Sequence, residues 1–144
     1  MRNGVALIIL YDRNKRLLLQ HRTQDARIMP DYWAFFGGGI KDGETPEEAV
    51  RREAFEELNY RAKAPELVCE QDYKIGKIKG YMYVFIEEFC DNKSDLRLQE
   101  GQGWGWFKYT EIAPLKMIEH DREVVMFVGR FIEKLSKTCR QNML

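Results

Sequence analysis

The strongest constraint on the fold is a well-marked helix start that follows a run of three glycines, Gly37–Gly39. Thr45 is a suitable N-cap residue, Pro46 fits the first helical position, and Glu48 completes a Thr-x-x-Glu capping box. The sequence therefore predicts a helix that begins directly after Thr45 and runs to about Leu58. The three glycines are expected to form a loop ahead of this helix.

The acidic residues of the predicted helix lie on one side of it. Glu53, Glu56 and Glu57 are spaced i, i+3 and i+4, so their carboxylates share one helical face. The opposite face consists of apolar residues that are expected to dock the helix on a sheet: Val50, Ala54, Phe55 and Leu58. Like charges at these spacings destabilise an isolated helix by about 0.2–0.5 kcal/mol per pair. The acidic face therefore needs an explanation.

Two interpretations of this acidic face compete. A solvated, glutamate-rich surface is the simpler one, because charge runs are common. A binding site for a hard cation such as Mg²⁺ or Mn²⁺ is the other, because three oxygen ligands share a rigid face without histidine or cysteine nearby. The preceding glycines favour the cation site. Without Cβ atoms, the backbone at Gly38 and Gly39 can approach a metal ion and the phosphate groups of a substrate closely.

The segment GGIKDGETPEEAVRREAFEELNY resembles the Nudix box, written G-x5-E-x7-R-E-U-x-E-E-x-G-U with U an aliphatic residue. The fixed positions are occupied by Gly38, Glu44, Arg52, Glu53, Glu56 and Glu57. Asn59 replaces the usual glycine, and Tyr60 replaces an aliphatic residue. Asn59 can still end the helix in a left-handed conformation, so neither departure affects a predicted metal ligand.

The resemblance implies a Mg²⁺-dependent hydrolase, with Mn²⁺ as the alternative cofactor. It implies these metal ligands: the carboxylates of Glu53, Glu56 and Glu57 and the carbonyl group of Gly38. Arg52 and Glu44 resemble the pair that orients the carboxylates. The reaction also requires a general base, for which Glu53 or Glu57 is a candidate. Glu100 is another, because MutT-like members of the family often carry an acidic ligand or base just before the last strand. The alternative for Glu100 is an ordinary solvated loop position.

Two hairpins, a further strand and a C-terminal helix complete the predicted order of elements. The ranges are 5–11 and 16–21 for the first hairpin, 67–75 and 78–89 for the second, 104–107 for the strand, 110–114 for a helical turn and 121–137 for the last helix. This order predicts an α/β (α+β) sandwich of the Nudix type with a mixed β-sheet between two helices. We expect a single domain over residues 1–137 and a frayed tail over residues 138–144.

Composition and charge limit the classes of binding partner that we expect. Lys plus Arg and Asp plus Glu number 23 each, so no bulk basic field indicates a nucleic acid polymer. The apolar run Val5–Leu10 is too short to cross a membrane, so none is expected as a partner. Cys69, Cys90 and Cys139 are odd in number and far apart, which predicts free thiols in a cytoplasmic protein.

Four residues outside the motif are candidate substrate contacts, each with a structural alternative. Arg22 ends the first hairpin and can meet phosphate or be an ordinary surface residue. Phe35 can pack against a base, although strand aromatics more often belong to the core. Glu119 and His120 open the last helix, where MutT-like proteins place a polar side chain that reads the base. The alternative for His120 is an exposed helix cap.

The predicted substrate is a nucleotide-like small molecule. The sequence signatures of Nudix enzymes that act on ADP-ribose, dinucleoside polyphosphates or coenzyme A are absent. By elimination, we expect a MutT-like pyrophosphohydrolase that cleaves a phosphoanhydride bond in a nucleoside triphosphate or another nucleoside diphosphate derivative, oxidised nucleotides included. A nucleotide-sugar hydrolase is the alternative, because Phe36 occupies a position where many MutT-like proteins have proline. A non-catalytic nucleotide sensor is a third interpretation. Many Nudix proteins are dimers, so a homodimer also stays open.

Overall fold

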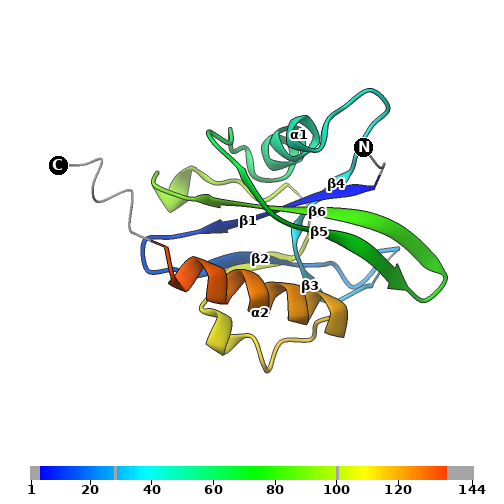
Figure 1. The fold of residues 1–144 in the computed structure, drawn as a ribbon. Coiled ribbons are helices and arrows are strands. Elements are labelled where there is room, and N and C mark those ends of the chain that lie inside the picture. The colour runs from blue at the N-terminus through cyan, green and yellow to red at the C-terminus, as the bar shows by residue number, and fades with distance from the viewer. Residues whose placement is uncertain (1–3, 28, 100, 136–144) are drawn as a thin grey trace. The chain divides into compact units, whose positions relative to one another are not determined.

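A computed structural model describes residues 4–27, 29–99 and 101–135 (Figure 1). Its elements are β1 (Val5–Tyr11), β2 (Leu17–His21), β3 (Trp33–Ala34), β4 (Phe36–Gly39), α1 (Pro46–Leu58), β5 (Glu66–Ile75), β6 (Ile78–Glu88), the 3-10 helix η1 (Lys93–Asp95), β7 (Gly103–Phe107), the 3-10 helix η2 (Tyr109–Glu111) and α2 (Glu119–Glu133). This set, with two helices and a mixed sheet, confirms the predicted α+β class.

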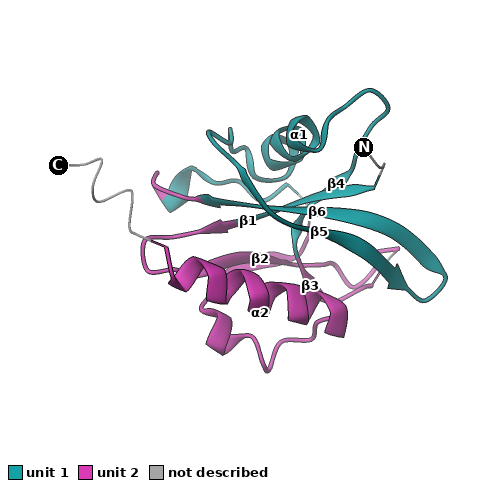
Figure 2. Cartoon of the chain, in the orientation of Figure 1, with its two compact units in different colours: residues 1–9, 35–87, 93–99 teal, residues 10–34, 88–92, 100–144 magenta. Residues whose placement is uncertain are grey.

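The chain divides into two compact units (Figure 2). The first comprises residues 4–9, 35–87 and 93–99, and the second comprises the other described residues. Strand β1 contributes residues 5–9 to the first unit and residues 10–11 to the second. A single domain over residues 1–137 stays a prediction, and the expected tail lies outside the described residues.

In the first unit, β1 lies between β4 and β6. Strand β4 pairs antiparallel with β1, from Val5 opposite Gly39 to Ile8 opposite Phe36. Strand β6 neighbours β1 and pairs antiparallel with β5, which confirms the second predicted hairpin. Helix α1 packs on β4.

The docking face of α1 differs from the prediction at one position. Val50, Ala54 and Leu58 are fully buried, as expected, but Phe55 is 41% exposed. The guanidinium group of Arg61 lies over the Phe55 ring, 4.4 Å from its centroid. Phe55 points away from the sheet because it lies about 100° around the helix from Ala54.

The glycine run also differs from the prediction, because Gly37–Gly39 belong to strand β4 rather than to a loop. Gly37 has φ +131°, and a Cβ atom there would lie 2.2 Å from the carbonyl oxygen of Ala6 on the paired strand. Pairing with β1 at this distance requires glycine. The glycines thus bring a strand, rather than a loop, alongside the helix.

In the second unit, β2 pairs antiparallel with β7 along its whole length, and its first residue, Leu17, also pairs with Tyr11 of β1. The predicted first hairpin is therefore confirmed. Helix α2 begins at Glu119, two residues before the predicted start, and Lys134 is its C-cap. The predicted end at residue 137 lies outside the described residues. Gly129 allows close packing, because a Cβ atom there would lie 2.2 Å from the Cβ of Tyr109.

Cys69 is free, as predicted. Cys139 lies outside the described residues, so the prediction of free thiols stays a prediction for Cys90 and Cys139. Within the part of the chain that the structure describes, no helix has the length and apolar character needed to cross a membrane.

Candidate active site

Both ends of α1 are fixed by specific contacts. The Thr45 hydroxyl accepts a hydrogen bond from the Glu48 N–H at 3.1 Å, and the Glu48 carboxylate accepts one from the Thr45 N–H at 2.8 Å. At the other end, Asn59 adopts the left-handed conformation, with φ 56° and ψ 35°. These contacts confirm the predicted capping box and helix end. The helix therefore presents its glutamates from a defined position.

Arg52 connects the acidic residues on and just before helix α1. Its Nε and Nη2 atoms donate to the Glu44 carboxylate at 2.8 and 3.1 Å. Its Nη1 atom donates to Glu53 at 3.0 Å and to Glu56 at 3.3 Å. Nη2 also donates to the carbonyl oxygen of Gly39 at 2.9 Å. One guanidinium group thus links three carboxylates to strand β4.

The pairing of Arg52 with Glu44 shifts the pKa of both groups. Hydrogen bonding to Arg52, followed by the hydrogen bond from the Lys41 N–H, lowers the pKa of Glu44 to about 2. The hydrogen bond to Glu44 in turn raises the pKa of the Arg52 guanidinium. Both groups therefore remain charged at neutral pH, and Arg52 offsets part of the local negative charge.

Glu57 lies in a different environment from an ordinary surface glutamate. It is 4% exposed, and its Oε1 atom accepts a hydrogen bond from the N–H of Gly37 at 2.7 Å. The side chain of Glu53 is 15% exposed and that of Glu56 is 53% exposed. Two of the three glutamates thus face strand β4 rather than bulk solvent. This placement does not fit the interpretation of a purely solvated acidic helix.

Gly38 lies against the carboxylate of Glu53. A Cβ atom at position 38 would lie 2.6 Å from Oε1 of Glu53 and 2.8 Å from its carboxylate carbon. A side chain at this position would displace the carboxylate of Glu53, so glycine here leaves the carboxylate its place against the strand. At Gly39, by contrast, an added Cβ would meet nothing within 4 Å.

The donor set at this edge of α1 fits a hard divalent cation, because it consists only of carboxylate and carbonyl oxygens. Within residues 4–27, 29–99 and 101–135, no three His, Cys, Asp or Glu side chains converge in an arrangement that holds a metal ion. The contacts give the reason: Arg52 binds Glu53 and Glu56, and the N–H of Gly37 binds Glu57. Metal binding would therefore require these carboxylates to exchange hydrogen bonds for the ion.

The structure brings seven predicted site residues together in the first unit: Gly38, Gly39, Glu44, Arg52, Glu53, Glu56 and Glu57. Glu100 lies outside the described residues. The chain just before it is tied to the end of α1, because the Gln99 N–H donates to the carbonyl oxygen of Glu57 at 2.9 Å. The Arg97 N–H donates to the carbonyl oxygen of Leu58 at the same distance.

The predicted substrate contacts are more scattered. Phe35 is 6% exposed, which agrees with a core position. Arg22, Glu119 and His120 belong to the second unit. The Glu119 side chain is 78% exposed and pairs with Arg122 at 3.1 Å. The role of each of these residues in substrate binding stays a prediction.

The prediction from the sequence does not include two backbone N–H donors of the site. The N–H of Gly37 binds Glu57, but no local signal reveals it, because the contact depends on the register of β4 against β1. The N–H of Lys41 binds Glu44 at 2.9 Å. Its signal is the Asp42-Gly43 pair, which marks a turn between the two residues.

Comparison with known proteins agrees with this geometry. A family model described as the NUDIX domain matches residues 1–127. The nucleoside triphosphatase NudI of Escherichia coli O81 is 28% identical over 134 residues, covering 86% of this chain and 92% of NudI. The NAD-capped RNA hydrolase NudC of Chromobacterium violaceum is 30% identical over 114 residues, covering 78% of this chain and 40% of NudC.

Solved structures show the same fold. The MutT protein of Methanosarcina mazei Go1 matches with a TM-score of 0.75 at 17% identity, covering 91% of this chain and 94% of that one. The dihydroneopterin triphosphate pyrophosphohydrolase of E. coli matches with a TM-score of 0.74 at 19% identity, covering 91% and 95%. The protein described here belongs to the Nudix family and is a Nudix hydrolase.

Proposed function

We propose that this Nudix hydrolase is a Mg²⁺- or Mn²⁺-dependent pyrophosphohydrolase that cleaves a phosphoanhydride bond in a nucleoside triphosphate or another nucleoside diphosphate derivative. The observation that carries the proposal is the edge of α1 where Glu53 and Glu57 face the glycine strand β4. The names of NudI and of the dihydroneopterin triphosphate enzyme, both of which act on triphosphates, support the substrate class. Oxidised nucleotides are included in this class.

In this proposal, the carboxylates of Glu53, Glu56 and Glu57 hold the metal together with the Gly38 carbonyl. A bound divalent cation offsets the charge of the diphosphate and lowers the pKa of the attacking water. Arg52 positions the carboxylates, since it contacts Glu53 and Glu56 directly. Glu44 in turn holds the guanidinium group through two hydrogen bonds.

The general base that accepts the proton of the attacking water is one of three glutamates. Glu57 is the first candidate, and the N–H of Gly37 fixes one of its carboxylate oxygens. Glu53 is the second candidate. Glu100, which lies outside the described residues, is the third, as base or additional ligand.

On the substrate side, we propose that Arg22 meets phosphate and that Gly38 and Gly39 let the substrate approach the backbone. Phe35, Glu119 and His120 are proposed contacts of the base. The proposal includes a single domain in the cytoplasm, no nucleic acid polymer or membrane as partner, and a homodimer as an open option.

A nucleotide-sugar hydrolase is the second candidate, favoured by Phe36 in place of the proline of many MutT-like proteins. A non-catalytic sensor is a weaker one, because such domains usually lose catalytic carboxylates, and all of them are present here.

The test is a phosphate-release screen with Mg²⁺ over nucleoside triphosphates, nucleotide sugars, ADP-ribose and dinucleoside polyphosphates. We expect the highest kcat/KM on a nucleoside triphosphate. A clear preference for nucleotide sugars would select the second candidate. No turnover on any compound by the pure, folded protein would refute the proposed function.

A further inference from the structure

Strand β5 lies at one end of the sheet. Among the residues that the structure describes, it pairs only with β6, so its other edge has no neighbouring strand. The pairing is continuous from Cys69 to Ile75, and the turn Gly76-Lys77 joins the two strands. In an antiparallel ladder, every second residue of an edge strand directs its backbone N–H and C=O groups away from the neighbouring strand. These groups are a template for a further strand.

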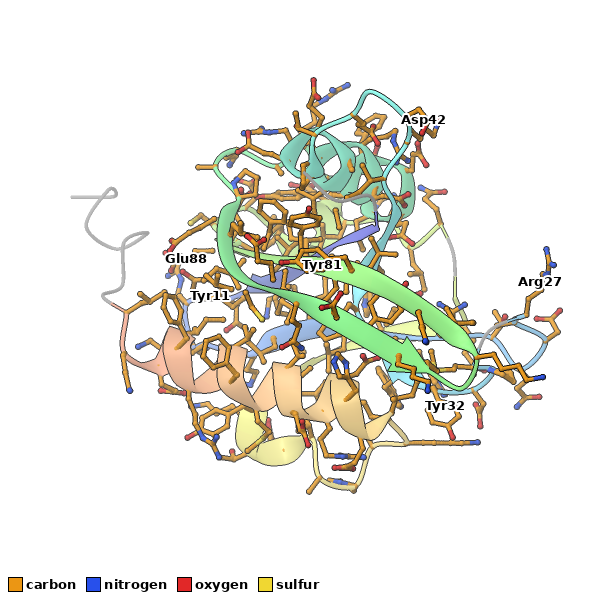
Figure 3. All side chains as sticks on the ribbon, turned by 45° about the vertical axis from the view of Figure 1, so that its right-hand side comes forward. Tyr11, Arg27, Tyr32, Asp42, Tyr81 and Glu88 are labelled. Atoms are coloured by element: carbon orange, nitrogen blue, oxygen red, sulfur yellow. The ribbon has the colours of Figure 1, made fainter. Side chains whose placement is uncertain are left out.

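The largest side chain on the half-buried face of β5 leans away from this open edge. A Cβ atom at Gly80 would lie 2.6 Å from the hydroxyl oxygen of Tyr73, so the tyrosine ring lies over β6. Figure 3 labels Tyr81, the residue of β6 opposite Asp72. The other face of the strand has exposed, charged side chains: Glu70, Asp72 and Lys74.

Two lysines near the end of the hairpin lie directly opposite each other. Lys74 of β5 is paired with Lys79 of β6, and Lys77 lies in the turn. Like charges at directly opposite positions destabilise a sheet. Within the described part of the chain, neither Lys74 nor Lys79 has an ion pair that offsets this repulsion. Because Glu70 and Asp72 come earlier in β5, the charged face of the strand is acidic in its middle and basic at its end.

The order of these charges selects one register in which two copies of β5 can pair. Two antiparallel strands related by a two-fold axis are opposed about one central residue. A centre at Glu70, Asp72 or Lys74 opposes that residue to its own copy. A centre at Gln71 opposes Glu70 to Asp72. Only a centre at Tyr73 opposes Asp72 to Lys74, on both sides of the axis, without directly opposed like charges.

We propose that β5 pairs antiparallel with β5 of a second copy of this chain, with Tyr73 at the two-fold axis. Each Lys74 then lies opposite Asp72 of the second copy, which offsets the repulsion from Lys79. Asp72 also interacts within its own chain, but a carboxylate has about four acceptor positions and can bind a further donor. This pairing gives a defined surface to the homodimer that the proposed function leaves open, and it does not depend on hydrolase activity.

Sedimentation velocity of the full-length protein over about 5–500 µM measures the dimerisation. We expect a reversible monomer–dimer equilibrium with a Kd on the order of 50 µM, because the paired segment is short and small interfaces are typical of weak complexes. Two-dimensional ¹H–¹⁵N NMR spectra over the same concentrations locate the interface. The amide signals of residues 70–75 should shift most on dilution.

Variants with altered charge test the register. K74E and D72K each place like charges opposite one another on both sides of the axis, so each should raise the Kd about tenfold or more. D72K/K74E exchanges the two charges and should restore the Kd to within about threefold of the wild-type value. K108E is the matched control, because it changes the net charge by the same amount as K74E at an exposed position of the second unit. It should leave the Kd unchanged.

The proposal is overturned if the wild type remains monomeric at about 500 µM, if K74E and K108E dimerise equally, or if the exchanged variant stays as weak as K74E. Dilution shifts centred outside residues 70–75 would also overturn it. The substituted residues are all exposed, and the spectrum of each variant reports its folding directly. Because sedimentation requires no substrate, loss of dimerisation and lack of hydrolase activity are distinguished.

Discussion

The two long helices each carry a buried carboxylate, but the surroundings differ. In α1, Glu57 receives a hydrogen bond from the N–H of Gly37, and Arg52 binds the neighbouring glutamates. In α2, burial raises the pKa of Asp121, and only the nearby His120 opposes that shift. The apolar face of α2 is buried along its length, and its N-cap residue, Ile118, makes no side-chain hydrogen bond.

In the proposed function, α1 supplies the metal ligands, whereas most of α2 serves to pack the second unit. α1 has a cap at each end and turns acidic residues toward the glycines of strand β4. Arg52 and the N–H groups of Gly37 and Lys41 compensate the repulsion between these acids. α2 buries a stripe of aliphatic side chains, and its buried acid receives little compensation. Substitutions in the two helices should therefore affect different properties.

The largest expected effect is the loss of kcat caused by a substitution in α1. Replacing Glu57 with glutamine keeps the acceptor for the Gly37 N–H but removes the negative charge, so kcat should fall about 1,000-fold with the fold intact. Glu123→Gln on the exposed side of α2 is the control and should leave kcat unchanged. Steady-state hydrolysis of the best substrate measures both. A Glu57→Gln enzyme close to wild type would refute the metal-ligand assignment.

The glycine strand should be almost as sensitive. In Gly38→Ala, the new Cβ would meet the Glu53 carboxylate at 2.6 Å and displace it. A shift of this size is expected to reduce kcat/KM about 100-fold. Gly103→Ala in strand β7 is the matched control, because an added Cβ there meets nothing within 4 Å. Equal kcat/KM values for the two variants would show that the position of Glu53 does not matter.

A third buried acid, Glu87 in β6, tests whether burial alone makes a carboxylate catalytic. It is 7% exposed and accepts hydrogen bonds from the Tyr60 hydroxyl and from the N–H groups of Lys63 and Ala64, the latter at 2.7 Å. Glu87→Gln should lower the free energy of unfolding by about 2 kcal/mol, because it weakens these charge-assisted bonds.

Urea unfolding measures this effect, with the exposed Glu66→Gln as control. Because Glu87 holds the turn after α1 rather than the metal ligands, kcat of the folded variant should change far less than in Glu57→Gln. A large loss of kcat with unchanged stability would contradict the structural role of Glu87.

The smallest effect concerns Asp121. Burial raises its pKa above 3.8, so the folded state holds the proton more tightly than the unfolded state. The stability contributed by the neutral form is present below pH 3.8 and is lost as the pH rises through the folded-state pKa. At pH 7, Asp121→Asn should therefore be more stable than wild type by on the order of 1 kcal/mol. Urea unfolding at pH 7 and pH 3.5 checks the sign. A less stable variant at pH 7 would contradict the unfavourable burial of this charge.

Much of the fold is predictable because its signals are local. The Thr45–Glu48 box, Pro46 and Asn59 locate α1, and alternating apolar residues locate the hairpins. The prediction of a loop at the glycine run is wrong, because glycines form a strand only when a partner strand lies beside them. The need for glycine at position 37 arises from the nearby carbonyl oxygen of Ala6 on β1. The predicted face of Phe55 is wrong for a similar reason, since an aromatic residue beside an apolar stripe can also pack against a neighbouring arginine.

The site is predictable in part. The spacing of Glu53, Glu56 and Glu57 places them on one face, and the motif adds Arg52 and Glu44. Spacing does not reveal that one face contains environments as different as a 4% exposed Glu57 and a Glu56 side chain that is 53% exposed. That difference arises from strand β4, which contacts one edge of the helix.

The most direct test of the central claim, that this edge of α1 is a divalent-metal site, is paramagnetic line broadening by Mn²⁺ in the ¹H–¹⁵N spectrum. It requires no knowledge of the substrate. At substoichiometric Mn²⁺, we expect the amide signals of residues 37–39 and 53–57 to broaden first in the wild-type protein and to persist in Glu57→Gln. Broadening centred on any other acidic segment, or equal broadening in the wild type and the variant, would contradict the account.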